Sequence, residues 1–277
     1  MKPSMVARRT PKLPKQKSAR GGLTLVINLH RRRDRLRTIR HVLRGAVSTW
    51  ERVDAVDGRE LDWPDVSQHL RSKALADAQW AEVRNVPTIC SKTGSFSPHL
   101  TLGAVGCALS HRKAWQRLAA SNCDWALILE DDVSAVAHDL EATLERCVSS
   151  LPSSWQLCLV GFHESTGQLL LPGQRLRLSE LGPDEGQTGL FGYLLRRSAA
   201  CELLGPHGEV FPLAHQIDVE LGTRHWRPMS RFALSPEAVL VHAAKSEEAA
   251  CDTDVQTLSI DRSKKAHVGM QPHMLVL

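Results

Sequence analysis

Trp125-Ala-Leu-Ile-Leu-Glu-Asp-Asp132 is the stretch of this chain that decides its fold. The first five residues are apolar throughout, which is typical of a central strand covered on both faces. Three carboxylates, Glu130, Asp131 and Asp132, follow the strand immediately. Sheets built from such strands bind their ligands outside the carboxyl ends of the strands. The stretch therefore predicts an α/β fold with a ligand site at this edge of the sheet.

Strands and helices alternate on both sides of this stretch. Apolar runs rich in β-branched residues predict strands, and apolar positions at helical spacing predict helices. The expected strands are 23–29, 50–55, 155–160, 190–195 and 239–241, and the expected helices are 31–44, 72–83, 102–120, 135–149, 198–204 and 215–226. This alternation predicts an open, mostly parallel sheet with helices on both faces, because the units are too few for a closed barrel.

The positive charge of the chain belongs to its amino-terminal end. The 277 residues carry a formal net charge of +5, and seven of the 35 basic residues lie within residues 1–22, which contain no acid. The remainder has 28 basic against 30 acidic residues. We expect residues 1–22 to form a disordered basic tail, because few large apolar groups are present to offset the entropy of ordering. A transit peptide is the alternative. Residues 23–260 are expected to form one folded domain, and residues 261–277 a second tail.

Composition also narrows the location of the protein. The sequence contains neither the apolar core of a secretory signal nor a run long enough to span a membrane. Seven scattered cysteines suit a reducing compartment better than a disulfide scaffold. We expect a cytoplasmic protein with at most peripheral membrane contact through the basic tail, and the secretory pathway stays open. Specific nucleic-acid binding is not expected, because the tail lacks interleaved aromatic residues.

The three consecutive carboxylates after the central strand call for a positive partner. Adjacent like charges destabilise a protein unless a cation or basic groups compensate them. Oxygen ligands favour hard ions such as Mn²⁺ or Mg²⁺, which bridge to substrate phosphates. We therefore expect a metal at Glu130, Asp131 and Asp132. The alternative is that Asp131 or Asp132 caps the next helix.

Several motifs, in the right order and spacing, resemble glycosyltransferase family 25, which includes bacterial lipopolysaccharide galactosyltransferases and procollagen galactosyltransferases. The matching motifs are Ile27-Asn28-Leu29, Asp34-Arg35, Glu51-Arg52, Ala55 to Gly58, Gly103 to Cys107, Leu109-Ser110-His111, Trp115, Leu129 to Val133, Gly192-Tyr193-Leu194, Ile217-Asp218 and Ser246 to Asp254. The resemblance implies a GT-A-like (Rossmann-like) fold for residues 23–260, a UDP-sugar donor and a metal at the acidic cluster. Residues 59–102 contain no recognised motif, and Val239 to His242 lack the expected aromatic and glutamine residues.

Within this frame, other side chains become candidates for the site. Asn28, Arg35 and Asp57 are expected near the uridine or ribose, although each could instead fix a loop. The small-residue helix face at Gly106 is expected to lie beneath the donor, with Ser110 and His111 at its polar edge. His242 is a weaker candidate for a further metal ligand.

Asp218 is the expected catalytic base. A hydroxyl acceptor must lose its proton as the new bond forms, and a positioned carboxylate can accept that proton. The alternative is that Asp218 caps the helix that follows it, in which case Glu220 or Glu164 would substitute as the base. Resemblance to β-galactosyltransferases implies inversion at the anomeric carbon.

The sequence thus predicts a metal-dependent transfer of a hexose from a UDP-sugar to a hydroxyl on a glycan, lipopolysaccharide or protein. Galactose is favoured by the resemblance. The competing hypothesis is a non-catalytic, UDP-sugar-binding relative that retains the fold. The intact Glu130-Asp131-Asp132 cluster argues against it.

Overall fold

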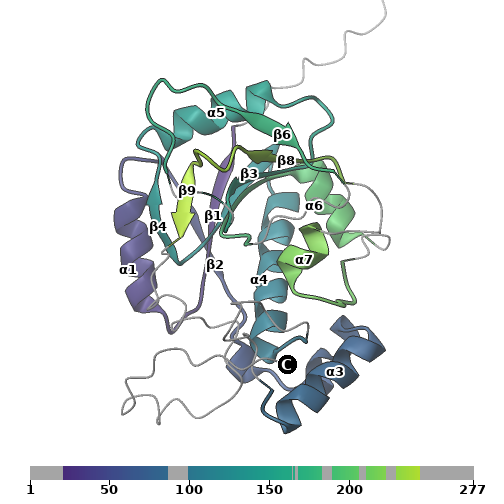
Figure 1. The fold of residues 1–277 in the computed structure, drawn as a ribbon. Coiled ribbons are helices and arrows are strands. Elements are labelled where there is room, and N and C mark those ends of the chain that lie inside the picture. The colour runs from purple at the N-terminus through teal and green to yellow at the C-terminus, as the bar shows by residue number, and fades with distance from the viewer. Residues whose placement is uncertain are drawn as a thin grey trace, which may run out of the picture.

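A computed structural model describes residues 21–86, 99–163, 165, 168–182, 189–205, 210–222 and 229–243 (Figure 1). Most of the expected amino-terminal tail, the whole of the expected carboxyl-terminal tail and the motif from Ser246 to Asp254 lie outside these residues. Gly21 and Gly22 do lie within them, and a Cβ atom on Gly22 would come 2.1 Å from the Trp125 ring.

The main sheet of the described residues has seven strands in the order β2-β1-β3-β7-β5-β8-β6. Five strands run in one direction, whereas β6 and β7 run in the opposite one. The expected open, mostly parallel sheet is thus confirmed. The bounds are β1 Leu23–Asn28, β2 Glu51–Asp54, β3 Trp125–Glu130, β5 Leu157–Gly161, β6 Leu178–Glu180, β7 Gly192–Arg196 and β8 Arg231–Leu234.

Helices cover both faces of the sheet, as expected. Ala126 and Ile128 of β3 pack into one core cluster with α4 and α6, while Leu127 and Leu129 pack into a second cluster with α1 and α5. Figure 1 shows α1 and α4 on opposite sides of the sheet. The helices are α1 Arg33–Val42, α2 Trp63–Val66, α3 Ser72–Val83, α4 Leu102–Ala119, α5 Leu140–Ser150, α6 Arg197–Leu204 and α7 Ile217–Gly222, with short 3-10 turns at Gly58–Glu60 and Ser67–His69. No helix among the described residues is long and apolar enough to cross a membrane.

The expectation for residues 135–149 was wrong at its start. Residues Val133–Val136 form strand β4, which pairs antiparallel with β9, Val241–Ala243, in a two-stranded ribbon beside the main sheet. Helix α5 begins only at Leu140. The ribbon depends on a partner that is more than a hundred residues away in the sequence, so the local pattern could not reveal it.

Candidate functional site

The acidic cluster lies where two parallel central strands end. Glu130 is the last residue of β3, and its Cα is paired with that of Ile27 on the neighbouring strand β1. Asn28, the last residue of β1, follows directly. The carboxyl ends of β1 and β3 are therefore adjacent, as the sequence predicted for a ligand site at this edge. The three carboxylates nevertheless have three different environments.

Asp131 is held by two of the residues that were expected to contact the donor. Asn28 Nδ2 donates to Asp131 Oδ2 at 2.6 Å, and Arg35 Nη1 donates to Asp131 Oδ1 at 3.0 Å. Asn28 Nδ2 also donates to the carbonyl oxygen of Arg32 at 3.1 Å. Burial raises the pKa of Asp131, although Arg35 opposes the shift. Asp131 thus links β3 to β1 and α1, and donor contact by Asn28 and Arg35 stays a prediction.

Glu130 is held by a buried chain of hydrogen bonds from α4 and β7. Trp115 Nε1 donates to the Tyr193 hydroxyl oxygen at 2.9 Å, and that hydroxyl lies 2.9 Å from His111 Nδ1. His111 Nε2 lies 3.2 Å from Glu130 Oε1. The indole can only donate, so the Tyr193 oxygen accepts its proton and the Tyr193 hydroxyl is free to donate to Nδ1. His111 then carries its proton on Nε2 and donates a hydrogen bond to the Glu130 carboxylate.

These contacts fix the position of His111. It is fully buried, and its ring lies between Tyr193 and Glu130. Although Glu130 is partly buried, which raises its pKa, that pKa is lowered overall, chiefly because the carboxylate accepts the His111 hydrogen bond. The geometry assigns His111 to holding the ionised Glu130, and direct contact with a donor stays a prediction.

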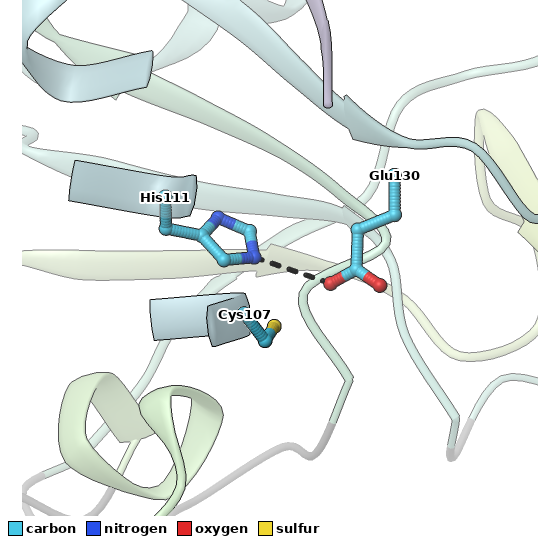
Figure 2. A group of neighbouring side chains, drawn as sticks. All are labelled: Cys107, His111 and Glu130. Carbon is cyan, nitrogen blue, oxygen red and sulfur yellow. Dashed lines mark hydrogen bonds and ion pairs between the residues drawn. The ribbon is translucent and has the colours of Figure 1, made fainter. Parts of the chain in front are cut away.

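Cys107 completes this part of the site, and sequence reasoning missed it. The ligand atoms of Cys107, His111 and Glu130 all lie within 4.8 Å of one another. Figure 2 shows Cys107 and His111 pointing from the same helix toward Glu130. The sequence did contain a signal for Cys107: it lies four residues before His111, and residues four apart share a helix face. Burial raises the pKa of Cys107, and the charges of Glu130 and Asp218 raise it further, which favours a thiol in the metal-free protein.

Asp132 has an unsatisfied oxygen. Its Oδ1 is buried and has no hydrogen-bond partner among the described residues. Burial raises the pKa of Asp132 to about 7, and the negative charge of Glu130 adds to the shift. Neither Asp131 nor Asp132 caps the next helix, because strand β4 follows them and the residue before α5 is Asp139. An orphaned buried carboxylate oxygen is what a cation would satisfy.

His242 lies on the ribbon strand next to this segment. Ala243 pairs with Val133, the residue after Asp132, and His242 pairs with Ala135. The His242 Nε2 atom is buried without a hydrogen-bond partner in the described part of the chain. The His242 Nε2 atom is thus a second unpartnered atom that could ligate a metal, and it lies on β9, the strand that pairs with β4 directly after Asp132. Metal binding by His242 remains a prediction.

Gly106, Ser110 and Asp57 shape the loop that follows β2. A Cβ atom on Gly106 would lie 2.7 Å from the Val56 carbonyl oxygen, so only glycine permits this approach of α4. The Ser110 hydroxyl accepts from the Val56 N–H at 2.8 Å and donates to the Gly106 carbonyl at 2.6 Å. Arg31 Nε donates to Asp57 Oδ2 at 2.5 Å. The small-residue face therefore packs against the loop, and the structure offers no separate support for donor contact by these three residues.

Asp218 is the second residue of α7. Its Oδ2 accepts from the Gly189 N–H at 3.1 Å, and its Oδ1 accepts from the Val219 N–H at 2.8 Å. Its charge raises the pKa of Cys107, as that of Glu130 does. Glu220 is buried and accepts from the N–H groups of Ala214 and His215 at 2.7 and 2.9 Å. Glu220 is thus occupied with the backbone, and Glu164 lies outside the described residues.

An open, mostly parallel sheet with carboxylates at the carboxyl edge of a central strand is consistent with a Rossmann-like glycosyltransferase fold. The chain belongs to glycosyltransferase family 25, because the family model described as "Glycosyltransferase family 25 (LPS biosynthesis protein)" matches residues 23–167. This result confirms the resemblance that the motifs indicated.

Curated relatives show the same similarity at low identity. Human procollagen galactosyltransferase 2 is 25% identical over 226 residues, which cover 79% of this chain and 33% of the relative. Procollagen galactosyltransferase 1-A of Xenopus laevis is 25% identical over 258 residues, covering 84% and 38%. The mouse "Inactive glycosyltransferase 25 family member 3" is 30% identical over 165 residues, covering 57% and 25%. The chain therefore spans between a quarter and two fifths of the length of these relatives.

Proposed function

We propose that this chain transfers a hexose, with galactose favoured, from a UDP-sugar to a hydroxyl group on a glycan, lipopolysaccharide or protein, with inversion at the anomeric carbon. Family membership and the galactosyltransferases among the relatives support the proposal. The observation that carries it is the acidic cluster at the carboxyl ends of β1 and β3, with its unpartnered buried Asp132 oxygen.

The side chains at this edge fit a hard divalent cation such as Mn²⁺ or Mg²⁺. Asp132 and the Oε2 atom of Glu130 are the oxygen ligands we assign, and His242 is the candidate for a nitrogen ligand. Asp131 is already paired with Arg35 and would support the cluster without direct ligation. A bound divalent cation supplies Lewis-acid neutralisation of the negative charge that develops on the departing diphosphate.

The residues of the chain supply the remaining steps. His111 holds Glu130 ionised and oriented, while Asn28 and Arg35 fix the segment that leads from Glu130 to Asp132. Asp218 is the proposed base for the acceptor hydroxyl. Each of its oxygens accepts one backbone hydrogen bond, which orients the carboxylate and leaves a lone pair to receive a proton.

The direct test is release of UDP from UDP-galactose, measured with and without Mn²⁺ on the metal-stripped protein. UDP-glucose and UDP-N-acetylglucosamine serve as matched donors. We expect metal-dependent release with a preference for UDP-galactose. Release at the same rate after chelation would contradict the metal assignment, and equal rates with all three donors would contradict the preference for galactose.

A second candidate function is UDP-sugar binding without turnover. It is favoured by one observation, the similarity to a mouse relative that is named inactive. Calorimetry separates the two functions. Binding of UDP-galactose with neither hydrolysis nor transfer to any hydroxyl acceptor would support the non-catalytic function.

A further inference from the structure

The segment around α1 is dense in arginine. Residues 31–44 contain seven arginines and a single acid, Asp34. Three of the arginines have carboxylate partners: Arg31 pairs with Asp57, Arg32 with Asp34, and Arg35 with Asp131. These pairs belong to the fold and to the candidate site. The three pairs occupy the carboxylates of Asp57, Asp34 and Asp131, and Asp34 is the only acid of the segment.

The other four arginines, Arg33, Arg37, Arg40 and Arg44, form what we call the arginine face. All four are exposed, and none has an ion-pair partner among the described residues. Their spacing of four, three and four residues places them along one side of the helix, with helical positions within an arc of about 60°. Arg44 lies two residues beyond the helix end at Val42. The row is about 16 Å long, at a rise of about 1.5 Å per residue.

Folding does not require this face. The opposite side of α1 buries Ile39, and Leu43 just beyond the helix end is buried as well, both in the core cluster shared with β3. A cation near the carboxyl end of a helix interacts favourably with the helix dipole, which accounts for Arg40. The dipole does not account for Arg33, which is the first residue of the helix, where a cation is unfavourable. The arginine face therefore carries a charge that neither the helix nor its packing explains.

We propose that the arginine face docks the protein on an anionic phospholipid bilayer. A row of basic side chains on a flat flank matches a plane of phosphate headgroups. The exposed positions of the segment include no Phe, Tyr, Trp or large aliphatic side chain, which favours adsorption to headgroups over insertion into the bilayer. The exposed residues are Arg33, Asp34, Arg37, Thr38, Arg40, His41 and Arg44.

Docking of this face would place the candidate site close to the bilayer. Helix α1 begins at Arg33, five residues after β1 ends at Asn28, so the Arg33 end of the row is the end nearest to the acidic cluster. Arg35, on the opposite side of the same turn, contacts Asp131 directly. The bilayer surface would thus be separated from the edge at which we propose that the donor binds by the width of α1, about 10 Å.

The test is co-sedimentation of the full chain with vesicles of phosphatidylcholine alone and of an equimolar mixture with phosphatidylglycerol. The test variant replaces the four residues of the arginine face by glutamine. The control variant replaces four exposed arginines elsewhere in the chain, Arg71, Arg84, Arg175 and Arg197, by glutamine and so has the same net charge as the test variant. We expect the test variant to lose about fivefold in partition to the anionic vesicles per arginine removed, and the control to lose far less.

Three outcomes would overturn the proposal. One is unchanged binding of the test variant to anionic vesicles, and another is an equal loss in the control variant, which would indicate an effect of net charge alone. The third is a test variant that binds an RNA homopolymer more weakly than the parent protein does but binds the anionic vesicles equally well. Thermal unfolding checks that both variants are folded, and the paired variants Arg33→Gln/Arg37→Gln and Arg40→Gln/Arg44→Gln repeat the comparison with smaller changes.

Discussion

Asp131 and Asp132 are neighbours in the sequence, yet they have opposite environments. Asp131 is paired with Asn28 and Arg35, whereas Asp132 has a buried oxygen without a partner in the described residues. Asp132→Asn should lower metal-dependent donor turnover by about a hundredfold or more. The metal-free variant should be as stable as the parent or slightly more so, because a buried like charge is removed.

Asp131→Asn is the matched comparison. It leaves the largely buried Arg35 without its carboxylate and should cost about 3 kcal/mol of unfolding free energy. Urea unfolding and UDP release are measured on both variants. Full turnover in Asp132→Asn would remove that residue from the metal site, and an unaltered stability of Asp131→Asn would show that its ion pair contributes little.

Asp218 and Glu220 form a second matched pair, on α7. Asp218→Asn should reduce transfer by about a hundredfold while leaving the affinity for the UDP-sugar nearly unchanged, because only proton acceptance is lost. Glu220→Gln should leave the rate per folded molecule unchanged and lower stability by about 1 kcal/mol, since Glu220 accepts two backbone hydrogen bonds. An Asp218→Asn protein that transfers at the normal rate would show that Asp218 is not the base.

Tyr193 sets the proton position on His111. In the parent protein, ¹⁵N chemical shifts should identify His111 as the Nε2–H tautomer, because the Tyr193 hydroxyl donates to Nδ1. Tyr193→Phe leaves the Trp115 N–H and His111 Nδ1 without their partner. We expect a loss of about 2 kcal/mol in stability and a mixture of tautomers. An Nδ1–H tautomer in the parent protein would contradict the assigned hydrogen-bond chain.

At the scale of elements, the contact between α4 and the loop after β2 depends on glycine. Gly106→Ala would place a Cβ atom 2.7 Å from the Val56 carbonyl and close to Gly58, both of them backbone. Because backbone cannot move away as a side chain can, we expect a loss of about 1–3 kcal/mol, measured by urea unfolding. Gln116→Ala, on the exposed side of α4, is the control and should change stability by less than about 0.5 kcal/mol. Equal effects would mean that the loop adapts freely.

Periodicity predicted those elements that are amphipathic or uniformly buried. The expected bounds of α3 agree with the structure, and those of α4 differ by a single residue. In α4, buried positions recur at helical spacing from Ala104 to Leu118. Residues 135–136 were expected to be helical but belong to β4, since their backbone pairs with β9. Pairing with a distant strand overrode the local preference there.

At the scale of the whole molecule, the lowered pKa values of Asp34 and Asp57 predict that the protein loses stability in acid. The Arg32 hydrogen bond lowers the pKa of Asp34 to about 2, and although burial opposes it, the Arg31 hydrogen bond lowers that of Asp57. An unfolded aspartate titrates near pH 4, so the folded protein binds fewer protons in this range. The stabilisation from both groups is present above about pH 4. It should be lost as the pH falls through the lowered pKa of each group, which is about 2 for Asp34.

Urea unfolding over this pH range measures the effect. The double variant Asp34→Asn/Asp57→Asn should show a shallower decline of stability with acid than the parent protein. An equally steep decline would mean that other carboxylates account for the acid sensitivity. Asp34 is more than half exposed, so most of the difference should come from Asp57.

The sequence by itself determined the α/β class, the mostly parallel sheet, the place of the acidic cluster at its edge and the family. Each of these follows from local patterns, such as the apolar run from Trp125 to Leu129 ending in carboxylates, or from the order of motifs along the chain. The sequence did not assign separate roles to the three carboxylates. That assignment depends on contacts between distant segments: Asn28 and Arg35 with Asp131, Tyr193 with His111, and β9 with β4. Only the tertiary structure decides which carboxylate is paired and which keeps a buried oxygen without a partner among the described residues, because pairing and burial arise when residues far apart in the chain are packed together.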